Sequence, residues 1–437
     1  MARVIINAGH LSEALGVESA AEVLAVSGQR ISAEDEFVIG AALEGLYDAQ
    51  AEAAAQADGD SAKSVLLAPN RQSSALLQTY LAQRATEQQS VQPAEVPGAE
   101  APLVGVEAKF DEHDLLGWLG AFVPFVRNKL GIGRRDPRPP LSPEITPMPD
   151  TAKVAVIGDW GTNMYGAPPI SYAVQADGGY DLLVHLGDVY YAGSREEVQT
   201  SLLAGWKRMQ QGSPGTLSRT CNSNHEMYSG GAPLYELTLP AFEQSSTTWA
   251  TGNEYWLFVG LDAAYVDHDL DDEQLPWLQD VMAQQGDRKV VLFSHHQLFS
   301  ALRGQGPKLT AKLQQYLAGQ RIFAWYWGHE HLLALYEPHP SWGLTARCVG
   351  HGGFPYFRPH FGGAAHTDLP NGMAFRTFAA SVRAPQARVL DGSNEYLGDH
   401  RDRYGPNGFM RLRLEGPELQ EEVVTPAGAT LWTGQLA

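Results

Sequence analysis

Two histidines follow an aromatic run in the stretch FAWYWGHEHLLALYE, which extends from Phe323 to Glu337. In an extended segment, side chains at positions i and i+2 point to the same side. The imidazoles of His329 and His331 would therefore face one point, while Glu330 faces away. Two imidazoles that converge at the end of a buried strand seldom serve packing alone, so the pair indicates a metal site.

Four other apolar runs end in potential ligands in the same way. They end in Asp159 (VIGDWG), Asp188 followed by Tyr191 (VHLGDVYY), Asn224 with His225 (TCNSNHEMY), and His295 with His296 (VLFSHHQLF). Each motif alone has an ordinary explanation, such as a helix N-cap for an aspartate or a turn with a packed aromatic ring. Together they favour one site, because the carboxyl ends of the strands in an α/β sheet form a rim where ligands bind.

The number of donors indicates how many cations this rim would hold. A tetrahedral catalytic site takes three protein ligands and keeps one position open. The candidate ligands are Asp159, Asp188, Tyr191, Asn224, His295, His329 and His331. This set fits two cations better than one, and a shared carboxylate can bridge two cations that lie roughly 3.5 to 4 Å apart.

The elements that must position these residues begin near Lys153. Near-continuous apolar runs of strand length are KVAVIG, YDLLVHLG, KVVLFS and RIFAWYWG. Helical patterns lie between them, in the region after Pro169 and in REEVQTSLLAGWKRMQ, DEQLPWLQDVMAQQ and KLTAKLQQYLAG. This alternation predicts an α/β catalytic domain, which we place at residues 151–437.

Residues 1–150 have a different texture and carry no evident chemistry. Apolar residues recur at helical spacing, and two segments rich in proline, at 87–102 and 134–150, are typical of linkers. We predict a mainly helical accessory region with Pro-rich linkers. The apolar stripe of Leu115, Trp118, Leu119 and Phe122 would either dock on the catalytic domain or support contact with a partner protein or with a second copy of the chain.

Composition excludes several classes of partner. The 437-residue chain has a formal net charge of -19, which repels nucleic acid and anionic lipid at long range. No run of about 18 apolar residues occurs, and the N-terminus lacks the pattern of an export signal. Cys221 and Cys348 show neither metal-knuckle nor redox spacing. We therefore expect a cytoplasmic protein that acts on a small substrate, without nucleic acid and without a membrane.

The five motifs resemble a known family when they are taken in order. Gly-Asp-Trp-Gly, Gly-Asp-x-x-Tyr, Asn-His-Glu, a strand-end His and Gly-His-Glu-His are similar to the blocks of the purple acid phosphatase branch of the calcineurin-like metallophosphoesterases, over about residues 153–353. The resemblance implies a four-layer αββα sandwich. It also implies a first metal held by Asp159, Asp188, Tyr191 and His331, and a second held by Asp188, Asn224, His295 and His329.

The resemblance further implies which metals would be bound. Most branches of the superfamily carry a histidine two residues after the first aspartate, and here Gly161 stands in that place. The Tyr191 phenolate would replace this donor, which favours Fe(III) paired with Fe(II), Zn(II) or Mn(II). Two like divalent ions remain an alternative. One departure from the family is Ser223, which stands before Asn224 where a glycine is usual.

The implied activity is hydrolysis of phosphoric esters, with phosphomonoesters as the expected substrates. The two cations would lower the pKa of a bound water and so generate hydroxide for in-line attack. His225 would protonate the leaving alkoxide or hold a phosphate oxygen, or else serve the loop structurally. His296 would touch substrate or pack behind the ligands, and His351 is a candidate for lining the pocket.

Two other functions remain open at this point. The same bimetallic centre would serve a phosphodiesterase that acts on cyclic nucleotides or other small diesters. Alternatively, the phosphoesterase fold would be a scaffold, with the N-terminal helices as its working part. The complete set of ligands at the strand ends argues against a scaffold, because a site that had lost its activity would be expected to lose some of its ligands as well.

Overall fold

The computed structural model describes residues 138–437, apart from 191, 267, 303–307, 357, 359–364 and 383. The predicted helical accessory region and its apolar stripe lie outside these residues. The second Pro-rich segment is described from residue 138 onward, and it packs on the domain. Arg138 pairs with Asp271, and Trp277 Nε1 donates to the Ser142 carbonyl at 2.8 Å. The chain thus joins the domain before the expected boundary at residue 150.

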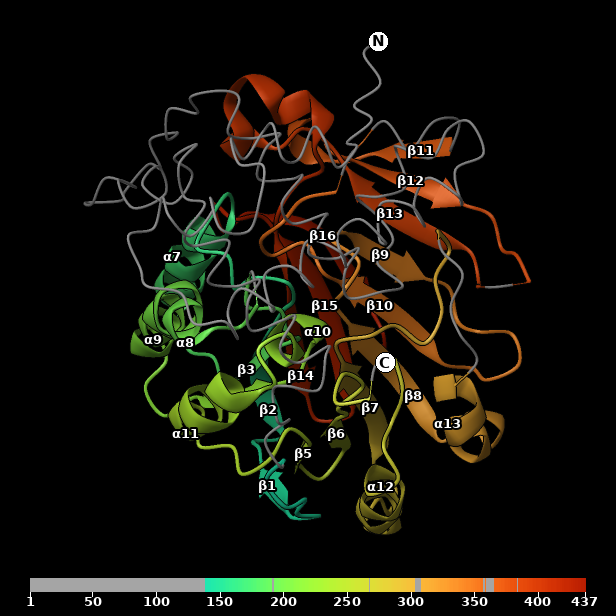
Figure 1. The fold of residues 1–437 in the computed structure, drawn as a ribbon. Coiled ribbons are helices and arrows are strands. Elements are labelled where there is room, and N and C mark those ends of the chain that lie inside the picture. Colours follow the sequence, from blue (N-terminus) through green and yellow to red (C-terminus); the bar gives the residue numbers. More distant parts are fainter. Residues whose placement is uncertain are drawn as a thin grey trace, which may run out of the picture.

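The larger sheet has ten strands and is mixed (Figure 1). Its strand order is β1 (Ile145–Pro147), β5 (Trp249–Gly252), β6 (Trp256–Gly260), β7 (Lys289–Ser294), β8 (Ile322–Trp327), β10 (Thr345–Val349), β9 (Leu333–Tyr336), β13 (Ala387–Asp391), β12 (Ala374–Phe378) and β11 (Ala365–Asp368). Strands β6, β7, β8 and β10 run parallel at its centre. The carboxyl ends of β7 and β8 therefore lie at the same edge.

The smaller sheet has six strands, and its order is β16 (Thr430–Gln435), β15 (Glu418–Val424), β14 (Phe409–Glu415), β2 (Thr151–Ile157), β3 (Leu182–His185) and β4 (Leu217–Thr220). Strands β2, β3 and β4 are parallel. Strand β14, from the C-terminal part of the chain, pairs antiparallel with β2, so segments far apart in the sequence lie side by side, as the red and teal strands of Figure 1 show.

The long helices cover the outer faces of the two sheets. Helices α12 (Gln274–Ala283) and α13 (Lys308–Ala318) pack on the ten-stranded sheet, and α7 (Ala167–Asp177) and α9 (Ala204–Gln211) on the six-stranded sheet. The short elements are α8 (Arg195–Glu197), η2 (Val198–Leu203), α10 (Asn224–Met227), η3 (Leu234–Thr238), α11 (Leu239–Ala241), η5 (Pro370–Gly372) and η6 (Glu395–Arg403). Within the described part of the chain, no helix is both long and apolar enough to cross a membrane.

The apolar strands are buried on both faces, which explains their near-continuous hydrophobicity. Because successive side chains of a strand point to opposite faces, Ala324 and Tyr326 of β8 enter the core between the sheets, while Trp325 and Trp327 pack against the outer helices. The inner core also contains residues from the smaller sheet, such as Val156 of β2. The observed fold is thus an α/β domain in which two mixed sheets pack face to face.

A buried ion pair joins the two sheets across this core. Arg347 of β10 donates from Nη2 to Glu421 Oε2 of β15 at 2.7 Å, and Tyr326 Oη donates to Glu421 Oε1 at 2.7 Å. Arg347 is 6% exposed and Glu421 is 1% exposed. A buried pair requires close geometry and full hydrogen bonding to offset the cost of removing both charges from water. These contacts fix how the two sheets lie relative to each other.

Candidate metal centre

Polar residues from both sheets meet at one edge of the molecule. Asp159, Asp188 and Asn224 follow β2, β3 and β4 of the smaller sheet, while His295 and His329 follow β7 and β8 of the larger one. Backbone contacts continue past the strand ends, because Asp159 N donates to the Gly187 carbonyl at 3.1 Å and Gly328 N donates to the His295 carbonyl at 3.1 Å. The strand tips therefore stay in register where the ligands begin.

One group of side chains surrounds His295 Nε2. This atom lies 2.8 Å from Asn224 Oδ1, 3.1 Å from His329 Nδ1 and 3.2 Å from Asp188 Oδ1. The other ring nitrogen, Nδ1, lies 2.9 Å from the Leu186 carbonyl and therefore carries the proton that it donates there. Nε2 is thus a lone-pair atom that faces two oxygens, and a cation between them would satisfy all three.

The surroundings of Asn224 orient its carbonyl oxygen toward this group. Asn224 begins helix α10, whose N-cap is Ser223, and its amide nitrogen donates to Tyr228 Oη at 2.9 Å. With the nitrogen held by Tyr228, Oδ1 points to His295. The serine that stands in place of the usual family glycine accepts a hydrogen bond from His225 N at 3.1 Å and donates to Glu226. It therefore caps the helix that carries Asn224.

A second group surrounds the hydroxyl of Tyr190. Tyr190 Oη lies 2.8 Å from Asp188 Oδ2, 3.3 Å from Asp159 Oδ1 and 2.9 Å from His331 Nε2. A hydroxyl has only one proton to donate, yet two carboxylates and an imidazole face it. Asp188 contributes one oxygen to each group, as a carboxylate that bridges two cations would.

The two carboxyl groups have pKa values displaced in opposite directions. Burial and repulsion from Asp188 raise the pKa of Asp159 well above its usual value. Burial alone would raise the pKa of Asp188, but the nearby His225 and His295 outweigh it and hold that pKa below its usual range. Two carboxyl groups in contact cannot both ionise easily without a positive charge between them. Bound cations would provide that charge.

The predicted phenolic ligand, Tyr191, lies outside the described residues, whereas its neighbour Tyr190 lies in the site. The sequence analysis did not identify Tyr190. Asp188 has a φ of 74°, so the chain turns after it. The rule that side chains at i and i+2 share a side holds for extended segments and therefore gives no signal for Tyr190.

The predicted catalytic histidines lie on the walls of the site. His225 is buried, its ring centroid lies 4.4 Å from that of Tyr190, and its Nε2 lies 3.8 Å from Asp188 Oδ2. His296 is also buried, with its ring centroid 4.6 Å from that of His329. Its pKa is well below the usual value because of burial and the nearby His268. His296 is therefore neutral at physiological pH.

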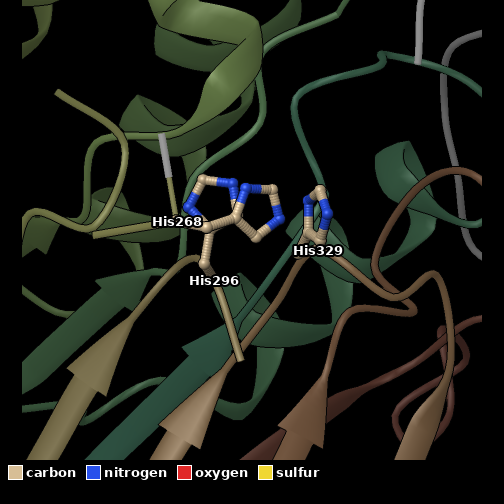
Figure 2. Close-up of side chains that lie close together, drawn as sticks. All are labelled: His268, His296 and His329. Carbon is tan, nitrogen blue, oxygen red and sulfur yellow. The ribbon is translucent and has the colours of Figure 1, made fainter. Parts of the chain in front are cut away.

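One further imidazole, His268, was not predicted. It lies in the loop between β6 and α12, and its ring centroid is 3.9 Å from that of His296 and 5.2 Å from that of His329. Figure 2 shows the three rings gathered beside the strand ends. No strand-end pattern precedes His268 in the sequence, so only the tertiary fold brings it to the site.

His351, a candidate for lining the pocket, follows β10 and is completely buried. Among the described residues, neither of its ring nitrogens has a hydrogen-bond partner. Burial lowers the pKa of His351 to about 3. The imidazole is thus a neutral core group in the folded protein.

The backbone is strained at the ligands. Asp159, Asp188 and His329 have φ angles of 55°, 74° and 67°, and His268 has φ of 54°. Residues other than glycine seldom adopt positive φ, at a cost of about 1 to 3 kcal/mol each, and such strain collects at functional sites. Gly328 allows the close approach, because a Cβ there would lie 2.5 Å from Asp159 Oδ2.

Comparison with known proteins gives one family match over part of the chain. A model of the calcineurin-like phosphoesterase family matches residues 152–333, and no curated protein sequence matches the chain. Among solved structures, the chain is similar to GAP50, the anchor in the inner membrane complex of Plasmodium, with 10% identity and a TM-score of 0.45. That match covers 65% of this chain and 88% of the Plasmodium chain.

Two other solved structures resemble the chain more weakly. A conserved uncharacterized protein of Streptococcus pneumoniae, a predicted phosphoesterase, has 10% identity and a TM-score of 0.29, covering 65% of this chain and 97% of its own. A single mutant of Vps29 from Entamoeba histolytica has 12% identity and a TM-score of 0.28. That match covers 65% of this chain and 98% of the Vps29 chain. These distant likenesses indicate neither activity nor partner. The family match over residues 152–333, together with candidate His/Asp metal-binding groups in the same domain, identifies a metallophosphoesterase domain of the calcineurin-like superfamily.

Proposed function

We propose that the chain hydrolyses small phosphomonoesters at a centre of two cations. The observation that carries this proposal is the convergence of lone-pair atoms on His295 Nε2 and Tyr190 Oη, with one oxygen of Asp188 in each group. The first cation would be held by Asp159, Asp188, Tyr190 and His331. The second would be held by Asp188, Asn224, His295 and His329.

The donor chemistry suits this assignment. Carboxylate, amide and phenol oxygens with imidazole nitrogens are ligands for iron, zinc and manganese. Two bound cations would supply Lewis acidity toward phosphoryl oxygens and lower the pKa of a water molecule. His295 is held in the tautomer that leaves Nε2 open by its bond to the Leu186 carbonyl, which is how metal-binding histidines are usually oriented.

His225 is the residue we assign to the leaving group. Its ring lies against Tyr190 and Tyr228, with centroid distances of 4.4 and 4.8 Å, so its orientation is fixed. Nε2 lies on the Asp188 side of the ring. A histidine held beside the substrate position can give a proton to a leaving oxygen or hold a phosphoryl oxygen. His296 would contribute to the wall of the same pocket.

The identity of the cations and the branch of the family are part of the proposal. A tyrosine among the ligands and Gly161 in place of a histidine favour the purple acid phosphatase-like branch, with Fe(III) beside Fe(II), Zn(II) or Mn(II). Phenolate bound to Fe(III) gives a charge-transfer band in the visible spectrum. Tyr190→Phe should remove that band and Tyr191→Phe should keep it; the reverse result would assign the phenolate to Tyr191.

The decisive experiment compares two substrates on the full chain. We expect purified protein to hydrolyse nitrophenyl phosphate in preference to bis-nitrophenyl phosphate, and to lose this activity with Asp188→Asn. Preference for the diester would make the chain a phosphodiesterase for small diesters. Absence of both activities in metal-loaded protein would contradict an enzymatic role and favour a scaffold that works through its N-terminal region. A cytoplasmic location stays a prediction.

A further inference from the structure

We propose that His268, His296 and His329 form a third cation site, which takes a borderline divalent ion such as Zn²⁺. It is distinct from the two groups around Asp188, and it touches the proposed function through His329, which is shared, and through His296, which lies on the wall of the pocket. Its other two residues, His268 and His296, belong to neither group.

The geometry of the three rings supports this site. One ring nitrogen from each imidazole can be chosen so that all three lie within 4.8 Å of one another. Three nitrogens placed about 2.0 to 2.1 Å from a tetrahedral zinc ion would lie roughly 3.4 Å apart. Each ring would therefore need to move by less than about 1 Å. Three imidazoles with an open fourth position are a known arrangement for zinc.

His329 is able to serve both sites because an imidazole has two ring nitrogens. Its Nδ1 faces the second-cation group, at 3.1 Å from both His295 Nε2 and Asn224 Oδ1. The third cation would then bind Nε2, the other ring nitrogen. An imidazole that binds two cations gives up both ring protons, so the remaining proton of His329 would pass to solvent when the third ion binds.

The backbone at His268 has the same unusual geometry as three of the proposed ligands. Its φ of 54° lies in the left-handed region, as do the φ angles of Asp159, Asp188 and His329. Histidine adopts this region more often than most residues other than glycine, although at a cost in backbone strain. The loop thus accepts a strained residue at the position that directs an imidazole toward His296 (Figure 2).

The test is the number of zinc ions bound per full-length chain, measured by elemental analysis after equilibration with a small excess of Zn²⁺. Wild type should hold three ions and His268→Asn two. Asparagine tolerates positive φ, so this variant removes the imidazole, which is the longer donor, and keeps the backbone. His366→Asn, at an exposed histidine remote from the site, is the matched control and should hold three. A wild-type count of two, or an equal count in wild type and His268→Asn, would overturn the proposal.

A spectrum gives a second readout that does not depend on activity. Co²⁺ in place of zinc should show a visible band from a tetrahedral nitrogen site, and this band should disappear in both His268→Asn and His296→Asn. If His268→Asn does not fold, His296→Asn decides the matter, and a band that persists in this variant would contradict the site. Asp159→Asn should lose the first cation and keep the band, so failure of the proposed function and failure of the third site give different results.

Discussion

The two sheets bring different chemistry to the same rim. The tips of the six-stranded sheet carry oxygen donors, Asp159, Asp188 and Asn224, whereas those of the ten-stranded sheet carry the imidazoles of His295, His329 and His331. Neither sheet alone contains a complete set of ligands for either cation. The site exists only where the sheets are packed together, so packing and metal binding should depend on each other.

The largest effect should come from the one residue that serves both groups. Asp188→Asn removes the charge that two cations would share, and we expect loss of both ions and a fall in kcat of about 1,000-fold or more. Metal content and nitrophenyl phosphate turnover measure this. Retention of both cations, with turnover within tenfold of wild type, would show that Asp188 does not bridge the two cations.

The second-largest effect should come from the Arg347–Glu421 ion pair, which joins the two sheets outside the metal centre. Arg347→Leu leaves Glu421 buried without its partner, which should lower the free energy of unfolding by about 3 to 5 kcal/mol in urea titrations. The double variant Arg347→Leu/Glu421→Leu is the control, because it removes both charges and should recover most of the loss. If the single variant loses less than about 1 kcal/mol, the ion pair does not hold the sheets together.

Two single variants, each lacking one donor from a different sheet, should distinguish the two cation sites. His295→Ala should release only the second cation and Asp159→Ala only the first, each with a fall in kcat of about 100-fold. Elemental analysis of the two variants measures the remaining ion. If both variants lost both ions, the two cation sites would load as a single cooperative unit, and it would not matter which sheet supplies the missing donor.

The smallest effect concerns an imidazole that belongs to neither group. The pKa of His351 is about 3 in the folded protein and near 6.5 when exposed. Between about pH 6.5 and pH 3, the imidazole of His351 binds a proton in the unfolded chain but not in the folded protein. The free energy of unfolding therefore falls as the pH falls through this range. The slope for one proton is about 1.4 kcal/mol per pH unit.

Urea titrations at pH 7 and pH 5 check this expectation. His351→Leu should reduce the loss of stability between the two pH values by about 2 kcal/mol. The reduction should be the same with and without added metal, since His351 is not among the proposed ligands. A reduction seen only in metal-loaded protein would place His351 in the site after all.

Sequence patterns predicted the features that are local. A strand that ends in glycine or serine followed by a polar residue is a short-range signal, and it picked out Asp159, Asp188, His295 and His329, which the structure places at the rim. Alternation along a strand likewise indicated buried runs. These features depend on neighbours within a few residues, which is the range over which backbone geometry dictates side-chain direction.

Features that depend on distant contacts were not predictable in this way. The pairing of β14 with β2 and of β1 with β5 joins segments more than 100 residues apart, and no local pattern encodes it. His268 reaches the site from a loop, and Tyr190 lies beside the ligands because of how the chain turns after Asp188. The division of donors between two sheets became visible only with the topology.

The left-handed backbone at Asp159, Asp188 and His329 has a consequence for protein engineering. Glycine at any of these positions would relieve the backbone strain. A mutant library selected for thermal stability alone would therefore enrich variants in which glycine replaces a proposed ligand. Directed evolution of this enzyme candidate should therefore select for turnover and robustness in the same round.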